Sequence, residues 1–397
     1  MSRRFLASLG ALAVVSLPAV LIAGQAQTTT AKPPTMGTTA SKPPATTTGA
    51  ARAAAPAKTY TPPRTPWGDP DLQGVYNYAT STPMQRPRTA GDKTILSDEE
   101  AADLQEELAF ALNRDRRDGG TQADANRAYN DFWMDPLRLK LTQDKRTSLI
   151  VDPPNGRMPS AVPPTPEKQK ERAVAAAMNA RFNNGFMDSY TDGDVGNRCI
   201  IRRRNEGGGH PYLPSIYNNI AQIFQTPGYV VIYAEMIHFS RIIPVDGRPH
   251  LSQDVKTWLG DSRGHWEGET LVVETTNFRS DDSMGRPLGR TGVVWGGADP
   301  DTYKITERFT RVAPDQIAYA VTMSDPHTWT QPITMMIPFN KTSDQIYEYG
   351  CQETNYDMYH WLSGARAREA KGEVFNPNAP GARAGGGEGG GAEQEER

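Results

Sequence analysis

From Asn219 onward, hydrophobic and polar residues alternate with a period of two, and Gly, Asp and Pro interrupt the runs. Such alternation, in runs rich in Val, Ile, Thr and Tyr, is typical of half-buried β-strands. The pattern predicts strands over residues 221–225, 229–237, 240–244, 255–259, 265–267, 270–278, 302–312, 316–323, 328–339 and 346–351.

Short turns separate these strands, as at Pro227-Gly228, Asp246-Gly247 and Pro314-Asp315. Short turns join antiparallel strands, because parallel neighbours need long crossover connections. So many consecutive strands must close on themselves or fold over if their edges are to be protected. The sequence therefore predicts a mainly β protein, an antiparallel meander that closes into a barrel or a strongly curved sheet.

Helical patterns occur earlier in the chain. Ser97-Asp98-Glu99-Glu100 has the form of a capping box and precedes a helix with Leu104 and Leu108 on one face. Thr165-Pro166-Glu167 opens a second helix, which is predicted to end near Arg181. A short strand over 147–151 lies between them, and both helices are expected to pack outside the barrel.

The N-terminal residues 1–26 have the organisation of a cleavable signal peptide. Arg3 and Arg4 precede an apolar stretch, and Gly24-Gln25-Ala26 supplies small residues for cleavage. Ser2 to Leu6 is also similar to a twin-arginine export signature. We therefore expect a periplasmic or secreted protein that has no stable membrane anchor after cleavage.

Composition divides the rest of the chain into three parts. Residues 27–64 are rich in Pro, Thr and Ala and are predicted to form a disordered, extended tether. Residues 371–397 are rich in Gly and Glu and read as a disordered tail. Residues 65–370 are left as a single β-rich domain, with the helices in its first third.

Charge and cysteine content narrow the possible partners. The formal net charge is −3, which gives no reason to expect nucleic acid as a partner.

Cys199 and Cys351 are the two cysteines, and an oxidising compartment favours a disulfide between them over two buried thiols. No histidine flanks either cysteine at the spacing of a zinc site, so we expect neither a metal nor a cofactor.

Three motifs carry a family resemblance: WGDPDLQG at residues 67–74, SLIVDPP at 148–154 and GDSRGHWEGETLVVETTNF at 260–278. Through them the sequence resembles a large, uncharacterised family of exported bacterial proteins. The resemblance covers nearly all of residues 66–370 and implies export and a shared fold, but no activity. A histidine often follows the second cysteine in that family, and Gln352 at this position argues against an essential metal or base there. Separately, Gly74-Val75-Tyr76 is similar to the opening strand of lipocalin-like (calycin) barrels.

Glu307 is the most informative polar position. On the strand predicted over 302–312 it shares the inward face with Tyr303, Ile305 and Phe309. A buried carboxylate must be paired or have a raised pKa, and such groups act as general acids or orient ligands. The alternative is a structural salt bridge to an inward arginine.

Two histidines and an arginine are further candidates for a ligand-binding or catalytic site. Glu235, His238 and Arg241 lie within one short segment, and His265 follows downstream. On a regular strand, Glu235 and His238 face opposite sides and cannot share a metal ion. His238 or His265 could serve as a base or as a ligand-binding donor, or could simply be a satisfied core or rim group.

Two other polar clusters have structural explanations. Residues 261–266 contain Asp, Ser and His, but one tight turn cannot form the relay of a catalytic triad. We interpret them as a hairpin connection with Trp266 packing inward. Arg202-Arg203-Arg204 and the glycines after it could bind an anion, although most charge runs are solvated surface.

These observations lead to three hypotheses. The first is binding of a small, partly apolar ligand in an aromatic-lined β-barrel cavity, with Glu307, His238, His265, Arg241 and Trp266 as candidate contacts. The second is a hydrolase or isomerase that uses Glu307 and a histidine as an acid–base pair. The third is a tethered envelope interaction domain without a small-molecule site.

Overall fold

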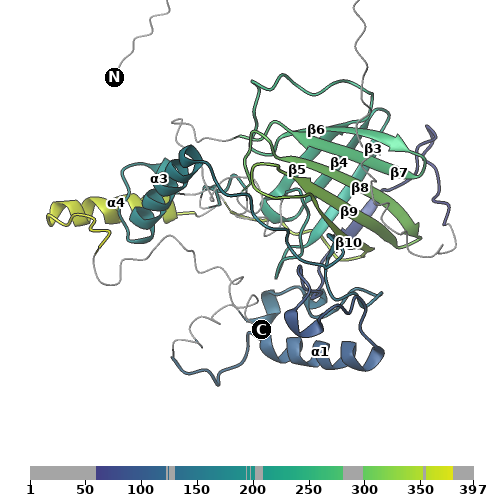
Figure 1. Ribbon diagram of the computed structural model, residues 1–397, viewed down its shortest axis with the longest axis horizontal. Coiled ribbons are helices and arrows are strands. Elements are labelled where there is room, and N and C mark those ends of the chain that lie inside the picture. The colour runs from purple at the N-terminus through teal and green to yellow at the C-terminus, as the bar shows by residue number, and fades with distance from the viewer. Residues whose placement is uncertain are drawn as a thin grey trace, which may run out of the picture. The chain divides into compact units, whose positions relative to one another are not determined.

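A computed structural model describes residues 60–378, apart from 122–123, 125–129, 194, 197, 202–208, 280–297 and 352–354 (Figure 1). The predicted signal peptide, nearly all of the tether and most of the tail lie outside the described residues, as does the Arg202-Arg203-Arg204 run.

The sheet is antiparallel and curls into a nearly closed barrel (Figure 1). Its nine main strands are β1 (Gly74–Asn77), β3 (Ile220–Thr226), β4 (Tyr229–Ala234), β5 (Phe239–Pro244), β6 (Asp261–Glu267), β7 (Thr270–Thr276), β8 (Lys304–Ala313), β9 (Gln316–Ser324) and β10 (Ile333–Lys341). Their spatial order is β5-β4-β3-β1-β10-β9-β8-β7-β6, and β2 (Ile150–Asp152) pairs with β10 beside this path. The predicted barrel of antiparallel strands is therefore confirmed.

The first and last strands close one side of the barrel. Tyr76 of β1 pairs with Lys341 of β10, and Asn77 pairs with Asn340. The other side of β1 pairs with β3, for example at Val75 and Gln222. The two ends of the strand order are thus β5 and β6, which follow each other in sequence.

Alternation along the strands creates a buried inner face. On β8, the buried positions are Ile305, Glu307, Phe309 and Arg311, as the period of two predicts. An aromatic cluster, all of it buried, lies in the interior. Its members are Tyr76, Tyr78, Tyr212, Phe309, Tyr319 and Phe339.

A short irregular segment, Gly209–Leu213, is buried against the inner face of the sheet. The Tyr212 ring lies 5.9 Å from the ring centroids of both Tyr319 on β9 and Phe339 on β10. The His210 ring lies 5.9 Å from that of Phe278. The barrel interior is therefore formed partly by chain that belongs to no strand.

Helices lie outside the barrel (Figure 1). The capping box at Ser97 is confirmed and opens α1 (Asp98–Ala111). Thr165 caps α3 (Pro166–Asn183), two residues longer than predicted. A further helix, α4 (Asp357–Ala370), was not predicted; its Trp361 ring packs edge-on against Phe182 of α3 at 4.9 Å. Short 3-10 helices occur at Arg88–Ala90, Asp131–Trp133, Pro136–Leu139, Tyr190–Asp192 and Met236–His238.

Several predicted strand boundaries were wrong. Residues 255–259 form no strand beyond a single bridge from Thr257 to Phe278, and residues 346–351 are also irregular. The strand predicted over 229–237 ends at Ala234, because the backbone then turns through positive φ at Ile237 and His238. The strand predicted over 328–339 starts only at Ile333.

Candidate functional site

Glu307 and Arg241 form a buried ion pair inside the barrel. Arg241 Nη2 lies 2.5 Å from Glu307 Oε2, and both side chains are almost fully buried. Glu307 projects inward from β8, and Arg241 projects inward from β5. The second carboxylate oxygen, Glu307 Oε1, accepts a 2.8 Å hydrogen bond from the Tyr319 hydroxyl. The inward arginine considered as the structural alternative for Glu307 is therefore Arg241.

The Arg241 guanidinium also bridges strands. Its Nε donates to Ser262 Oγ at 2.9 Å on β6, and its Nη2 donates to Thr275 Oγ1 at 2.8 Å on β7. The Ser262 and Thr275 hydroxyls share a hydrogen bond of 3.0 Å with each other. One side chain from β5 thus contacts inward groups on β6, β7 and β8.

Beside Arg241, β5 and β6 are also packed through apolar side chains. A Cβ built on Gly264 of β6 would lie 2.8 Å from Val245 Cγ1 and 3.0 Å from Ile243 Cγ2. We call this junction, formed by Arg241, Ile243 and Val245 against Ser262 and Gly264, the seam. Glycine is needed in the seam because any larger residue would meet these side chains.

Next to the ion pair, three buried side chains have polar atoms without a hydrogen-bond partner among the described residues. They are Arg241 at Nη1, Tyr212 at its hydroxyl and His210 at both ring nitrogens, none of which makes a hydrogen bond of ordinary geometry. Weaker hydrogen-bond contacts remain between the Tyr212 hydroxyl and the Arg241 side chain, and between His210 and the Leu259 backbone. Arg241 is close enough to both Tyr212 and His210 for its charge to affect their protonation. We call Arg241, Glu307, Tyr319, Tyr212 and His210 the interior polar cluster.

Burial dominates the ionisation of this cluster. Desolvation raises the pKa of Tyr212 to about 12, with Arg241 opposing the rise. It also lowers the pKa of His210 well below its ordinary value, and the Arg241 charge lowers it further. Burial and then Glu307 hold the pKa of Tyr319 well above 10. At neutral pH the phenols and the imidazole are therefore uncharged, and the ion pair supplies the charges of the cluster.

Arg241 itself stays charged despite its burial. Burial alone would lower the pKa of the guanidinium, but the Glu307 carboxylate, followed by Tyr212, raises it above its ordinary value. An unpaired buried guanidinium would be costly, so the carboxylate is what allows Arg241 to lie in the core.

Sequence reasoning missed His210 and Tyr212 as members of the site. Both lie on the Gly209–Leu213 segment, which has no periodic pattern from which burial could be inferred. The available signal was the glycine-rich run before His210, since glycine permits close backbone approach. A Cβ on Gly209 would indeed lie 3.1 Å from Ile201 Cδ1 and 3.2 Å from Leu259 Cδ2.

The predicted histidines lie outside the interior polar cluster. His238 is exposed, and its Nδ1 donates to the Tyr349 carbonyl at 3.1 Å. His265 is exposed on β6, where Nε2 lies 3.2 Å from Glu267 Oε1. Glu267 in turn pairs with Arg308 at 2.7 Å on the outer surface. The structure therefore does not bring either histidine together with Glu307.

Trp266 and Glu235 are buried or partly buried, but they lie outside the interior polar cluster. Trp266 packs against the core, and its buried indole N–H has no partner among the described residues. Glu235 is buried outside any strand and accepts a 2.9 Å hydrogen bond from the Tyr347 amide. Burial raises the pKa of Glu235 above its ordinary value, while the Tyr347 bond opposes the rise.

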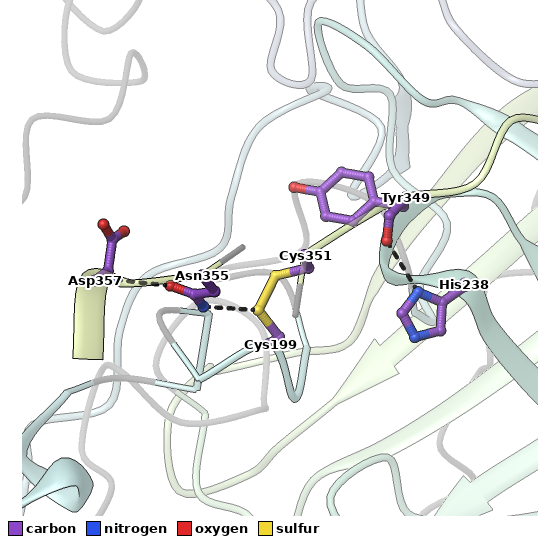
Figure 2. The surroundings of a disulfide bond; sticks show 6 residues. All are labelled: Cys199, His238, Tyr349, Cys351, Asn355 and Asp357. Atoms are coloured by element: carbon purple, nitrogen blue, oxygen red, sulfur yellow. Dashed lines mark hydrogen bonds between the residues drawn. A yellow bond between two sulfur atoms is a disulfide. The ribbon is translucent and has the colours of Figure 1, made fainter. Parts of the chain in front are cut away.

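Cys199 and Cys351 form a disulfide bond, as predicted (Figure 2). Their Cα atoms are 5.8 Å apart, and the bond closes a sequence separation of 152 residues. Asn355 Nδ2 donates to Cys199 Sγ at 3.3 Å, and His238 contacts the same C-terminal segment through Tyr349 (Figure 2). The disulfide thus links the chain that leads to His210 with the chain that leads to α4.

The described ranges hold neither a cluster of metal ligands nor a membrane-spanning helix. There, no group of three or more His, Cys, Asp or Glu side chains could hold a metal ion. None of the helices in the same ranges is long and apolar enough to span a bilayer.

In comparisons with known proteins, no family model matches the chain and no curated protein resembles it closely enough to count as a match.

Proposed function

We propose that this protein binds a small, partly apolar ligand inside the barrel, with the polar group of the ligand against Arg241 and Tyr212. The observation that carries the proposal is the set of unpartnered buried groups in the interior polar cluster. Each buried donor or acceptor without a partner costs about 1 to 3 kcal/mol. A ligand atom that pairs with several of them recovers part of this cost, which makes the position beside Arg241 a favourable one for binding.

The surrounding residues suit the apolar part of such a ligand. Tyr78 stacks on Phe339 at a centroid distance of 5.1 Å, and Phe309 packs on Tyr319 at 4.8 Å. Aromatic side chains with a few convergent polar groups are the common lining of small-molecule sites. Tyr212 combines both properties, because its ring belongs to the aromatic cluster and its hydroxyl to the polar one.

Binding is better supported than acid–base catalysis. Both oxygens of Glu307 are already engaged, one by Arg241 and one by Tyr319. No histidine predicted as its catalytic partner lies beside it, and His210 is not hydrogen-bonded to it. Glu307 is therefore suited to orient Arg241 rather than to exchange a proton with a substrate. A purely structural barrel is less well supported, since its buried polar groups should all be paired.

A Tyr212→Phe variant tests the site. The change removes one hydroxyl and keeps the ring, so the folded state should lose little stability, because that hydroxyl has only a weak contact with Arg241 to lose among the described residues. Ligands from a metabolite panel that raise the melting temperature of the native protein should raise it much less in the variant. Tyr229→Phe, which alters a hydroxyl bonded to Arg248 on the exposed surface, is the matched control. Equal shifts in Tyr212→Phe and in the native protein would contradict the site assignment.

We also propose that the protein works in the periplasm or outside the cell. The disulfide supports this location, because such bonds persist in oxidising compartments and are rare in the cytosol. Sequencing of the N-terminus of the protein isolated from its source should find a mature chain that starts near Gln27. An intact N-terminus on protein recovered from the cytoplasmic fraction would contradict the proposal.

A further inference from the structure

We infer that the ligand's polar group is an uncharged hydrogen-bond acceptor, most simply a carbonyl oxygen on an apolar body. The inference rests on the proposed ligand site and adds the chemical class of its occupant. It follows from the charges and from the hydrogen-bond roles of the interior polar cluster.

Charge balance excludes an ionic ligand. Arg241 and Glu307 contribute one positive and one negative charge, so the pair is already neutral. Bringing a further ion into the core costs several kcal/mol unless an opposite charge pairs with it. An anionic ligand would face Glu307, and a cationic ligand would face Arg241. Neither would find an unmatched opposite charge in the cluster.

Arg311 does not change this balance at the cluster. It is the next buried cation on the inward face of β8 and is separated from Glu307 by Phe309. Its guanidinium is held at a different place, where Nη1 donates to the Asp71 carbonyl at 3.0 Å and Nη2 donates to the Pro314 carbonyl at 2.6 Å. Two of its nitrogens are thus bonded to backbone oxygens, and its Nε, which has no partner among the described residues, lies with them away from the cluster.

Hydrogen-bond roles define the polar atom further. Arg241 Nη1 can only donate, so its partner must be an acceptor. The Tyr212 hydroxyl can donate to the same atom, because a carbonyl oxygen has two lone pairs. The neutral His210 imidazole has one donor and one acceptor, which allows it to bond a second polar atom of the ligand or the carbonyl itself. A ketone, ester or amide oxygen satisfies these requirements without adding charge.

Three probes of nearly the same size test this inference at pH 7.5: acetophenone has a carbonyl, benzoate has a carboxylate and ethylbenzene has no polar group. Calorimetry should show acetophenone binding about ten-fold more tightly than ethylbenzene, the effect of about one hydrogen bond to a charged group. Benzoate should bind more weakly than acetophenone. In Tyr212→Phe, the advantage of acetophenone over ethylbenzene should fall several-fold, whereas Tyr229→Phe should leave it unchanged.

The possible outcomes separate this inference from the proposed function. Tighter binding of benzoate than of acetophenone would overturn the uncharged class and leave the ligand site intact. Equal binding of acetophenone and ethylbenzene would overturn the acceptor role. If none of the three probes binds, and a crystal structure has only water beside Arg241 Nη1 and Tyr212, then both the inference and the proposed function are wrong.

Discussion

Arg241 Nε donates a 2.9 Å hydrogen bond to Ser262 Oγ, and this bond joins the two strands at the ends of the sheet order. Elsewhere around the barrel, neighbouring strands are held by ladders of backbone hydrogen bonds. At the seam, side chains take over this role. Arg241 supplies the polar part, and Ile243 and Val245 against Gly264 supply the apolar part. The buried ion pair therefore helps to close the barrel between β5 and β6, and it is also part of the candidate site.

Removing the carboxylate of the ion pair should be strongly destabilising. Glu307→Gln leaves the Arg241 charge buried without its counter-charge, and breaking such a pair typically costs about 3 to 5 kcal/mol. Urea unfolding should measure this loss. Glu274→Gln, which breaks an ion pair with Lys304 on the outer surface, is the control and should change stability little.

Replacing both partners should cost less than replacing one. In a Glu307→Met and Arg241→Met double variant no charge remains buried, so part of the loss should be recovered. The interpretation would be wrong if Glu307→Gln were no more destabilising than Glu274→Gln.

Gly264 should tolerate substitution poorly for steric reasons. Gly264→Ala would place a methyl group against Val245 and Ile243, and overpacking of this kind typically costs about 1 to 3 kcal/mol. Gly364→Ala is a matched control in α4, where a Cβ would contact nothing within 4 Å. This second change should stabilise the helix by up to about 1 kcal/mol. Thermal unfolding of both variants should therefore show shifts of opposite sign.

Acidification should destabilise the protein through His210. Because burial lowers the pKa of the folded imidazole well below 6.5, the unfolded chain binds this proton first as the pH falls. Because of this residue, the free energy of unfolding should be about 1 kcal/mol lower at pH 5.5 than above about pH 7.5. His210→Gln should lack this component of the pH dependence, measured by urea unfolding at both pH values. The exposed His265→Gln should retain it, and equal pH dependence in all three proteins would contradict burial of a neutral His210.

Loss of the disulfide should lower stability without removing the barrel. Replacing Cys199 and Cys351 by Ser releases a constraint over 152 residues, which the chain-entropy relation places at about 5 kcal/mol. Urea unfolding of the double variant should match that of the native protein under reducing conditions, and circular dichroism should retain the strand signal. Detection of two free thiols in the oxidised native protein would rule out the bond.

The sheet could be predicted largely from sequence because one face of each strand is buried. On β8 the alternation placed Glu307 inward correctly, and the pairing of an inward arginine with it was already the structural alternative. Which arginine, and from which strand, could not be predicted, because the contact between β5 and β8 depends on how the sheet closes. Alternation gives the face of a residue but not its neighbour across a barrel.

Other elements lacked a usable signal. Helix α4 has only Ala365 buried, so it carries no apolar stripe by which a helix is recognised. Residues 255–259 alternate like a strand, but they belong to a loop fixed by Asn277, whose Nδ2 donates to the carbonyls of Leu251, Ser252 and Val255. His210 and Tyr212 lie on an irregular segment, where only tertiary contacts determine burial. Of the cluster residues on strands, Glu307 and Arg241 were candidates from the sequence and Tyr319 was not, and the two residues of the irregular segment were not candidates either.

The pairing of β1 with β10 also sets an order on folding. When the chain enters its folding compartment N-terminus first, Tyr76 arrives long before its partner Lys341, so one edge of β1 stays unpaired until almost the whole domain has followed. Until then, β1 can be held only by β3, and the growing sheet presents an open edge that could pair with another chain. A chain cut short before β10 should therefore expose β1 and aggregate rather than persist as a smaller folded barrel.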